Sequence, residues 1–229
     1  MSIMKDYAQQ SGNALVMVLV ITGLFAMLTI VVSNSFDGTA SLQYSRKQIE
    51  SGIQDMLRYG ANLENTAYQM VQINNIGLTT LDFRSDQDNP ATLHQNSNCT
   101  SSICRVFETG GGIKWRRPPD AVVPDPSASA YIFSGTSPVY GHGLHTDADL
   151  FMSVEVTQNA CKAALDMLSI PLTADAPPDD DFINTSFTGV FSTTAGQEID
   201  HADLSGLKAF CFHDTGDDAY YFVYVLYPR

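Results

Sequence analysis

The sequence predicts an α+β fold, in which a long N-terminal helix precedes an antiparallel, β-rich globular head. Two observations predict the helix: residues 14–32 carry no charge, and residues 40–75 continue with apolar side chains at helical spacing. From Leu78 onward, short apolar runs alternate with Gly, Pro, Ser, Asn and Asp, as in sheets with long loops. We therefore expect a polar leader at 1–12, the helix at 13–77 and the head at 78–229.

The uncharged segment is long enough to cross a membrane. Residues 14–32 read ALVMVLVITGLFAMLTIVV, and a helix of this length extends about 28 Å, close to the thickness of the hydrocarbon core of a bilayer. Only Thr22 and Thr29 are polar, so the polar stripe of a water-exposed helix is missing. A secretory signal peptide is the alternative, but its apolar stretch is shorter, and Ser33-Asn34-Ser35 is a poor cleavage site. The segment predicts a helix that resides in a membrane or in an apolar bundle of helices.

Residues 40–75 predict an amphipathic helix. Its apolar positions follow one another mostly at steps of three and four, which places them on one face. These positions are Leu42, Ile49, Ile53, Met56, Gly60, Leu63, Ala67 and Met70. The pattern ends at residues 74–77, where Asn-Asn-Ile-Gly is typical of a helix C-terminus.

In the head, we expect an antiparallel sheet and one short helix. Thr157 is a candidate N-cap for a helix at 158–169, and the polar residues 213–218 predict the turn of a C-terminal hairpin. Two stretches rich in Pro and Asp, 118–129 and 171–181, predict surface loops. The predicted strands are 105–108, 113–116, 131–134, 150–156, 208–212 and 220–227.

Four cysteines predict two disulfide bonds. An even number, in a chain that begins with an apolar segment, indicates export to an oxidising compartment. Cys99 and Cys104 would close a tight local loop, which leaves Cys161 to pair with Cys211. The spacing of the four does not match a zinc or haem motif.

The charge of the chain is unevenly distributed. Residues 1–117 hold nine acidic and nine basic side chains, whereas residues 118–229 hold sixteen acidic and three basic ones, so the whole net charge of −13 lies in the second half. Such a surface repels nucleic acids, so we expect no nucleic-acid partner.

No catalytic motif is present: GxSxG, Walker A and HExxH patterns are all missing, so we predict no enzyme activity and no cofactor. Two polar segments are candidate cation sites, and for both an ordinary loop is the favoured interpretation; the spacing of the second does not match an EF-hand loop. Their candidate ligands are His142, His145, Asp147 and Asp149 in one, and Asp214, Asp217 and Asp218 in the other. Lys114, Arg116 and Arg117 form a basic cluster around Trp115, which either meets an acidic face of a neighbouring subunit or is solvated.

The N-terminal residues resemble those of a known superfamily. Residues 9–16 (QQSGNALV) form a leader that ends in glycine and leads into an uncharged helix, as in type IV pilins and type II secretion pseudopilins. In that superfamily, prepilin peptidase cuts after the leader glycine and the new N-terminus is methylated. The resemblance implies cleavage between Gly12 and Asn13. It also implies a filament core that includes Leu15, Met17, Leu19, Leu24, Phe25 and Leu28.

One residue departs from the superfamily pattern. The fifth residue after the cleavage site is usually a glutamate, and here it is Met17. This departure favours a minor or divergent subunit. The chain is also similar to alphaproteobacterial pilin-like proteins that share a GNAL-type start, a Gly-rich segment with Trp and Pro-Pro (110–119), an FTG motif (187–189) and an aromatic C-terminal strand.

The resemblance implies a structural subunit of a type IV pilus-like or pseudopilus filament, assembled through the N-terminal helix. The implied partners are other pilin-like subunits, prepilin peptidase and the inner-membrane assembly machinery. The subunit would reside in the bacterial inner membrane before assembly and would then be incorporated into a periplasmic or extracellular filament. The alternative is a periplasmic binding domain that a single helix anchors permanently in the membrane.

Overall fold

The computed structural model describes residues 39–87, 93–144, 147–171, 175–194 and 197–229. The chain divides into two compact units, Met1–Lys47 and Gln48–Arg229. Of the first unit, the structure describes only residues 39–47, which are helical. The second unit contains the sheet and both disulfides, and we call it the head unit.

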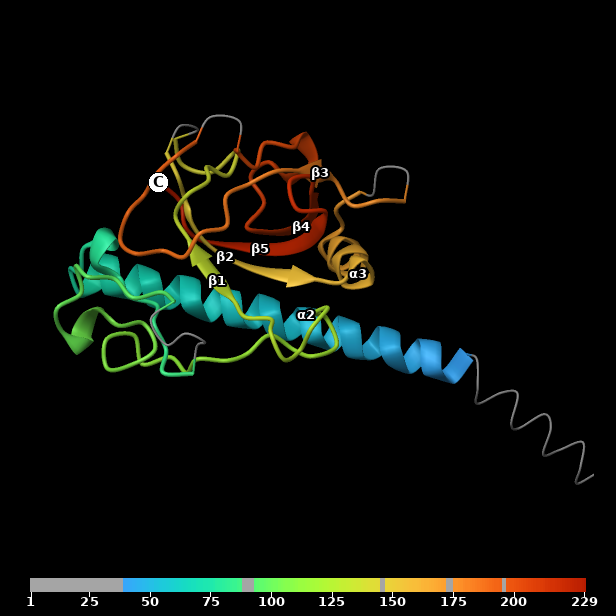
Figure 1. Ribbon diagram of the computed structural model, residues 1–229, viewed down its shortest axis with the longest axis horizontal. Coiled ribbons are helices and arrows are strands. Elements are labelled where there is room, and N and C mark those ends of the chain that lie inside the picture. The colour runs from blue at the N-terminus through green and yellow to red at the C-terminus, as the bar shows by residue number, and fades with distance from the viewer. Residues whose placement is uncertain (1–38, 88–92, 145–146, 172–174, 195–196) are drawn as a thin grey trace, which may run out of the picture. The chain divides into compact units, whose positions relative to one another are not determined.

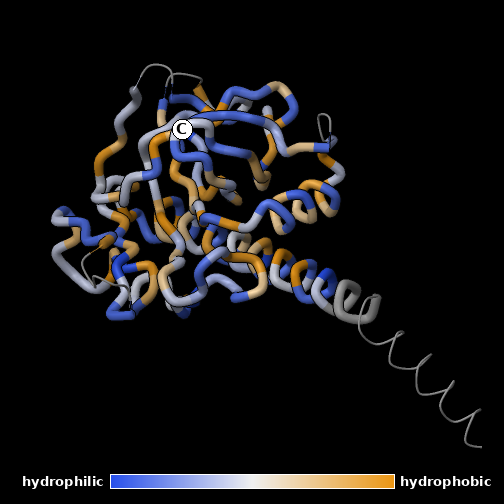
Figure 2. Tube along the Cα trace, turned by 45° about the vertical axis from the view of Figure 1, so that its right-hand side comes forward, coloured by the Kyte–Doolittle hydropathy of each residue, from blue (hydrophilic) through white to orange (hydrophobic). Residues whose placement is uncertain are grey.

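A long helix, α2 (Thr39–Tyr68), contributes one face to the hydrophobic core of the head unit. Figure 2 shows hydrophobic and hydrophilic residues mixed along its length. From Gln48 onward, the buried side chains follow the predicted stripe and include Ile53, Met56, Tyr59, Leu63, Ala67 and Met70. The side chain of Leu42, also predicted on this stripe, lies outside the described ones. The helix passes into a π-helical turn, η1 (Gln69–Ile73), and the chain then reverses at Asn75, which has a φ of 60°.

The sheet of the head unit has five strands in the order β1-β2-β5-β4-β3. They are β1 (Ile132–Ser134), β2 (Leu150–Val156), β3 (Asp179–Asp180), β4 (Ala209–Asp214) and β5 (Ala219–Tyr227). β5 is the central strand, and six of its nine residues are buried because both faces of the sheet are covered. Pairing is antiparallel except between β3 and β4, which run parallel, so the sheet is mixed and not wholly antiparallel as predicted.

Helices α2 and α3 (Gln158–Leu168) cover one face of this sheet (Figure 1). Tyr224 of β5 lies against Gly60 of α2, where an added Cβ would come within 2.5 Å of the tyrosine ring. Cys211 of β4 is on the same face and is bonded to Cys161 of α3. The opposite face carries an aromatic cluster formed by Phe151, Phe182, Phe212 and Tyr221. The short helix predicted at 158–169 is present as α3, and the side chain of Thr157 is its N-cap, because it accepts a hydrogen bond from the backbone of Ala160.

Three predictions about loops and strands are wrong. Residues 105–108 are not a strand, because backbone hydrogen bonds from Gly111 to Arg105 (3.0 Å) and from Gly112 to Glu108 (2.7 Å) close the chain into turns. Residues 113–116 belong to no strand of the sheet. Residues 171–181 are not only a loop, because Asp179–Asp180 form β3 and the side chain of Asp180 is buried. Asp180 accepts hydrogen bonds from the backbone of Asp181 and His201, which explains why an acidic residue is tolerated there.

Candidate functional site

A pocket of about 420 Å³ opens beside Trp115, the single tryptophan of the chain. Three loop segments form it: residues 84–87, Phe107–Glu108 and Lys114–Trp115. Lys114 and Asp86 are exposed, whereas Trp115 and Phe107 are half-buried. The volume is within the range of small-molecule sites, which commonly combine aromatic walls with a few polar groups.

Ion pairs and ring contacts hold three walls of this pocket. Arg84 lies 3.0 Å from the fully buried carboxylate of Asp82. Glu108 accepts two hydrogen bonds of 2.8 Å from Arg105. The ring of Phe107 packs edge-on against Phe83, with their centroids 6.3 Å apart. These side chains are therefore positioned before any ligand arrives.

Burial and a neighbouring positive charge shift the pKa of Asp82 in opposite directions. Its burial raises the pKa of the carboxyl group, and a backbone hydrogen bond and the charge of Arg84 oppose that rise. Asp82 also accepts a hydrogen bond from the backbone of Arg84 at 2.9 Å. Asp82 contacts Arg84 both at its backbone N–H and at its guanidinium, so it fixes both groups at the edge of the pocket.

The glycine-rich segment 110–112 lets the pocket loops approach one another closely. An added Cβ at Gly110 would collide with the carbonyl oxygen of Ile103, and one at Gly111 would collide with that of Val106. Gly112 has a φ of 67°, a conformation that side chains disfavour. The nearby disulfide Cys99–Cys104 closes the neighbouring loop. The segment therefore serves the packing of the loops, and Trp115 follows it directly.

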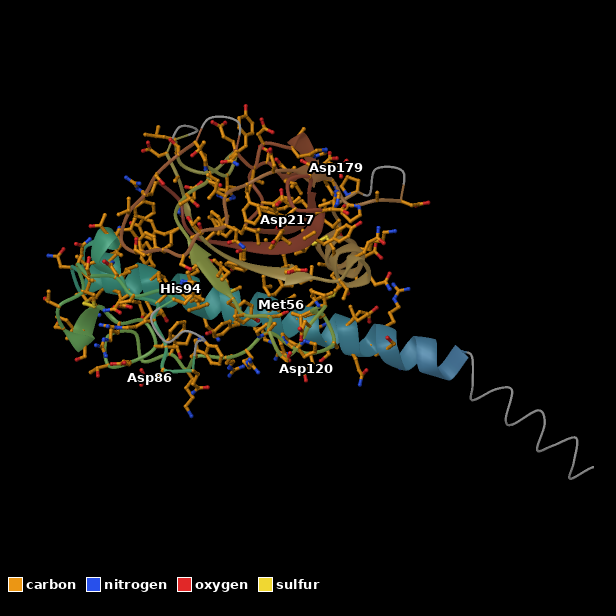
Figure 3. All side chains as sticks on the ribbon, viewed as in Figure 1. Met56, Asp86, His94, Asp120, Asp179 and Asp217 are labelled. Carbon is orange, nitrogen blue, oxygen red and sulfur yellow. A yellow bond between two sulfur atoms is a disulfide. The ribbon has the colours of Figure 1, made fainter. Side chains whose placement is uncertain are left out.

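A second group of polar residues lies at the end of the sheet formed by β3, β4 and β5. The imidazole of His213 is 2.9 Å from Asp179 through Nδ1 and 2.9 Å from Asp218 through Nε2. The hydrogen bond with Asp179 is the main cause that raises the pKa of His213, and partial burial opposes it. We call His213 and these two aspartates the imidazole clamp. Figure 3 shows Asp179 and Asp217 on a different side of the head unit from Asp86.

The acidic turn beside the imidazole clamp uses its carboxylates for hydrogen bonds within the chain. Asp217 accepts a hydrogen bond of 2.7 Å from the hydroxyl of Tyr221, and Asp214 accepts one from the backbone of Gly216. Burial, together with the neighbouring Asp217, raises the pKa of Asp214 to about 6. Among the described residues, no cluster of three or more His, Cys, Asp or Glu side chains has the geometry to hold a metal ion.

Two of the other candidate cation ligands, Asp149 and His142, also have separate structural partners. Asp149 is fully buried and accepts hydrogen bonds from the backbone of Val139 (2.8 Å) and of Arg229 (2.7 Å). Burial raises the pKa of its carboxyl group to about 6. His142 is 2.9 Å from the carbonyl of Leu207 through Nε2. His145 lies outside the described residues. Asp149 thus joins β2 to the end of the chain.

Both predicted disulfides are present in the structure. Cys99–Cys104 closes the short loop beside the pocket, and Cys161–Cys211 joins α3 to β4. The residues predicted for processing and for the filament core lie outside the described residues; they are Gly12, Asn13, Leu15, Met17, Leu19, Leu24, Phe25 and Leu28. Within the described ranges, no helix is both long enough and apolar enough to span a membrane.

Sequence reasoning missed most of the pocket. It selected Lys114 and Trp115 as part of a basic cluster, but not Arg84, which lies far along the chain, nor Phe107 and Glu108, which precede the glycine run. The only signal for these residues was the glycine run before Trp115, which indicates a tight turn but not what it packs against.

Comparisons with models of protein families, with characterised proteins and with solved structures find no match for this chain. The geometry of the head unit and the pattern of the sequence therefore carry the functional argument.

Proposed function

We propose that this chain is a structural subunit of a type IV pilus-like or pseudopilus filament, assembled through its N-terminal helix. The order of features along the chain carries the proposal. A polar leader ends at Gly12, nineteen residues without a charge follow at 14–32, and an amphipathic helix then supplies a face to the core of a disulfide-bonded head.

The apolar segment has to be hidden from water. If a helix of nineteen such residues exposed about 1,000 Å² of apolar surface, hiding it would contribute about 25 kcal/mol before any opposing terms. A bilayer hides that surface before assembly, and a bundle of neighbouring helices hides it in a filament. Met17 occupies the position of the usual glutamate, so this subunit lacks a carboxylate that could neutralise the N-terminal amine of a neighbour. We therefore assign it to the minor or divergent subunits.

Contacts within the head unit support a role for α2 as part of a stable head. Glu64 of α2 forms an ion pair with Lys208 and accepts a hydrogen bond of 3.0 Å from the hydroxyl of Tyr224. Gln72 donates a hydrogen bond of 2.5 Å to the hydroxyl of Tyr227. These polar contacts border the apolar face of the helix and fix its register on β5.

The N-terminus of the exported protein tests the proposal. Mass spectrometry should find a chain that begins at Asn13 with a methylated amine, produced by prepilin peptidase. A Gly12→Trp variant should remain uncleaved in the inner membrane, because a side chain at this position obstructs the peptidase. Gly216→Trp, at an exposed turn of the head, is the matched control and should be cleaved normally. Normal cleavage and assembly of Gly12→Trp would refute the proposal.

A permanently anchored periplasmic binding domain is the second candidate, and the pocket beside Trp115 favours it. In that case the apolar segment serves only as an anchor, and the head carries the function. An exported protein that retains Met1 would support this candidate and argue against the filament.

A further inference from the structure

We propose that the pocket beside Trp115 binds a neutral saccharide. The inference concerns only the head unit, so it holds whether the chain assembles into a filament or remains anchored. Its basis is the combination of a balanced charge, aromatic walls and side chains that are already fixed in place.

The charge of the pocket favours an uncharged ligand. Among the described residues that line it, Arg84 and Lys114 stand beside Asp86 and Glu108, so two positive charges face two negative ones. The ion pair Asp82–Arg84 and the ion pair Arg105–Glu108 are also balanced. The chain as a whole carries a net charge of −13, which repels anionic ligands from a distance. A cationic ligand gains no net attraction from this lining, because Arg84 and Lys114 offset Asp86 and Glu108.

The aromatic walls favour a ligand that has one apolar face. Trp115 and Phe107 both line the pocket, and Phe107 is anchored by Phe83 and by Phe133, whose ring centroid is 5.7 Å away. A sugar ring presents a face of C–H groups that packs against an aromatic ring, while its hydroxyl groups point outward from the edge. Charged groups and the amide of Gln87 supply donors and acceptors for those hydroxyl groups.

Other classes of ligand fit this lining less well. A lipid chain needs a continuous apolar wall, and only two of the eight described lining residues are large and apolar. A nucleotide phosphate needs an excess of positive charge, which the pocket does not have. Because Arg84, Glu108 and Phe107 are held by contacts within the head, little conformational freedom is lost when a small polar ligand binds.

The single tryptophan makes a direct test possible, because tryptophan fluorescence reports only on this pocket. The full chain is purified in a detergent without a sugar headgroup and titrated with methyl glycosides of glucose, galactose, mannose and N-acetylglucosamine. Disaccharides of the same sugars and glucuronic acid complete the panel. We expect a saturable change in fluorescence with at least one neutral sugar. Tighter binding of a disaccharide would identify the end of a polysaccharide as the ligand, and equal binding a single sugar unit.

Matched variants separate the pocket from the rest of the surface. Lys114→Gln replaces a charged hydrogen-bond donor with a shorter neutral one, and Gln87→Ala removes an amide, so each should weaken binding about tenfold in the same titration. Lys162→Gln on α3 is the control and should bind like the unaltered chain. Trp115→Phe, followed by calorimetry because the fluorescent group is lost, should also bind more weakly.

Three results would overturn the proposal. One is a fluorescence signal that does not change with any neutral sugar in the panel. Another is binding that Lys114→Gln, Gln87→Ala and Trp115→Phe all leave intact. The third is tighter binding of glucuronic acid than of the neutral sugars, which would show that the pocket selects an anion.

Discussion

The head unit contains two regions that are stabilised in different ways. The strands β2, β4 and β5 form a continuous ladder, with one register shift between Leu150 and Phe151, and most of its residues are buried. The described part of residues 78–119, by contrast, contains short helical turns, loops and one isolated bridge, between Asp82 and Arg105. The described part of this second region is held by particular contacts: a short disulfide, ion pairs and closely packed glycines.

The comparison indicates a division between the two regions: the sheet region supplies most of the stability, and the loop region sets the geometry of the pocket. In the sheet region, many similar contacts share the stabilisation, as expected where the hydrophobic effect dominates. In the loop region, each contact positions one wall of the pocket, so the loss of a contact alters the geometry of the site. We therefore expect changes in the sheet region to act mainly on stability, and changes in the loop region to act on binding as well.

The two disulfides offer the largest test of this division. Cys161–Cys211 spans a sequence separation of 50 and Cys99–Cys104 a separation of 5. Chain-entropy estimates give losses of about 4 and about 2 kcal/mol when the bonds are removed by paired Cys→Ser substitutions. Urea unfolding of the two variants measures both losses. Equal losses, or a greater loss for the short loop, would show that the stability of the sheet region depends on its disulfide no more than that of the loop region does.

Asp149 should make the stability of the sheet region depend on pH. Burial raises the pKa of its carboxyl group from 3.8 in the unfolded chain to about 6 in the folded one. The folded state holds this proton more tightly, so the contribution is complete below about pH 4 and is lost as the pH rises through 6, by about 3 kcal/mol at most.

Asp149→Asn removes that titration and leaves a neutral side chain in its place. The free energy of unfolding of the unaltered chain minus that of the variant should therefore decrease from pH 4 to pH 6.5, as measured by urea unfolding at each pH. Asp120→Asn, at an exposed position, is the control and should leave this difference unchanged with pH. A difference that increases with pH for Asp149→Asn would show that its carboxylate is stabilised by its hydrogen bonds more than burial destabilises it.

Gly111→Ala should have a smaller effect on stability, but one that extends to the pocket. The added Cβ collides with the backbone at Val106, so the loop has to shift, at a cost of about 1–3 kcal/mol. Gly216→Ala is the matched control. A Cβ added at Gly216 would lie 3.6 and 3.8 Å from the two carboxylate oxygens of Asp214, which are ordinary van der Waals distances. Thermal unfolding measures the difference. If Gly111→Ala is as stable as Gly216→Ala, the glycine run does not set the packing of the loops.

The sequence predicted the sheet region better than the loop region, and the reason is physical. The aromatic run of β5 and the stripe on α2 are periodic, and a period of two or of about 3.6 identifies a strand or a helix without knowledge of any partner. β3 has only two residues, both aspartates, so it has no apolar pattern to detect. Its position depends on Asp180, whose partners lie in the turn at His201 and in the next residue.

The pocket was also hard to predict, because its residues follow no periodic pattern. Lys114 and Trp115 stand out in the sequence because a charge and a tryptophan follow a glycine run. Arg84 and Glu108 become part of the site only through Asp82 and Arg105, and Asp82 and Arg105 meet in an isolated bridge that no periodicity predicts. The disulfides were easier to predict, since four cysteines allow only three pairings and two of the cysteines are close in sequence.

Under the proposed function, residues 14–32 drive assembly and the head does not. Leu24→Asp places a charge in the middle of the apolar segment, where insertion of one helix loses about 3 kcal/mol and where a filament would repeat the like charge in every subunit. Asp120→Asn changes only an exposed residue of the head and is the paired control. Membrane level and filament yield are measured for both variants. We predict that Leu24→Asp still reaches the membrane in part but forms no filaments, while Asp120→Asn assembles normally; normal polymerisation of Leu24→Asp would contradict the account.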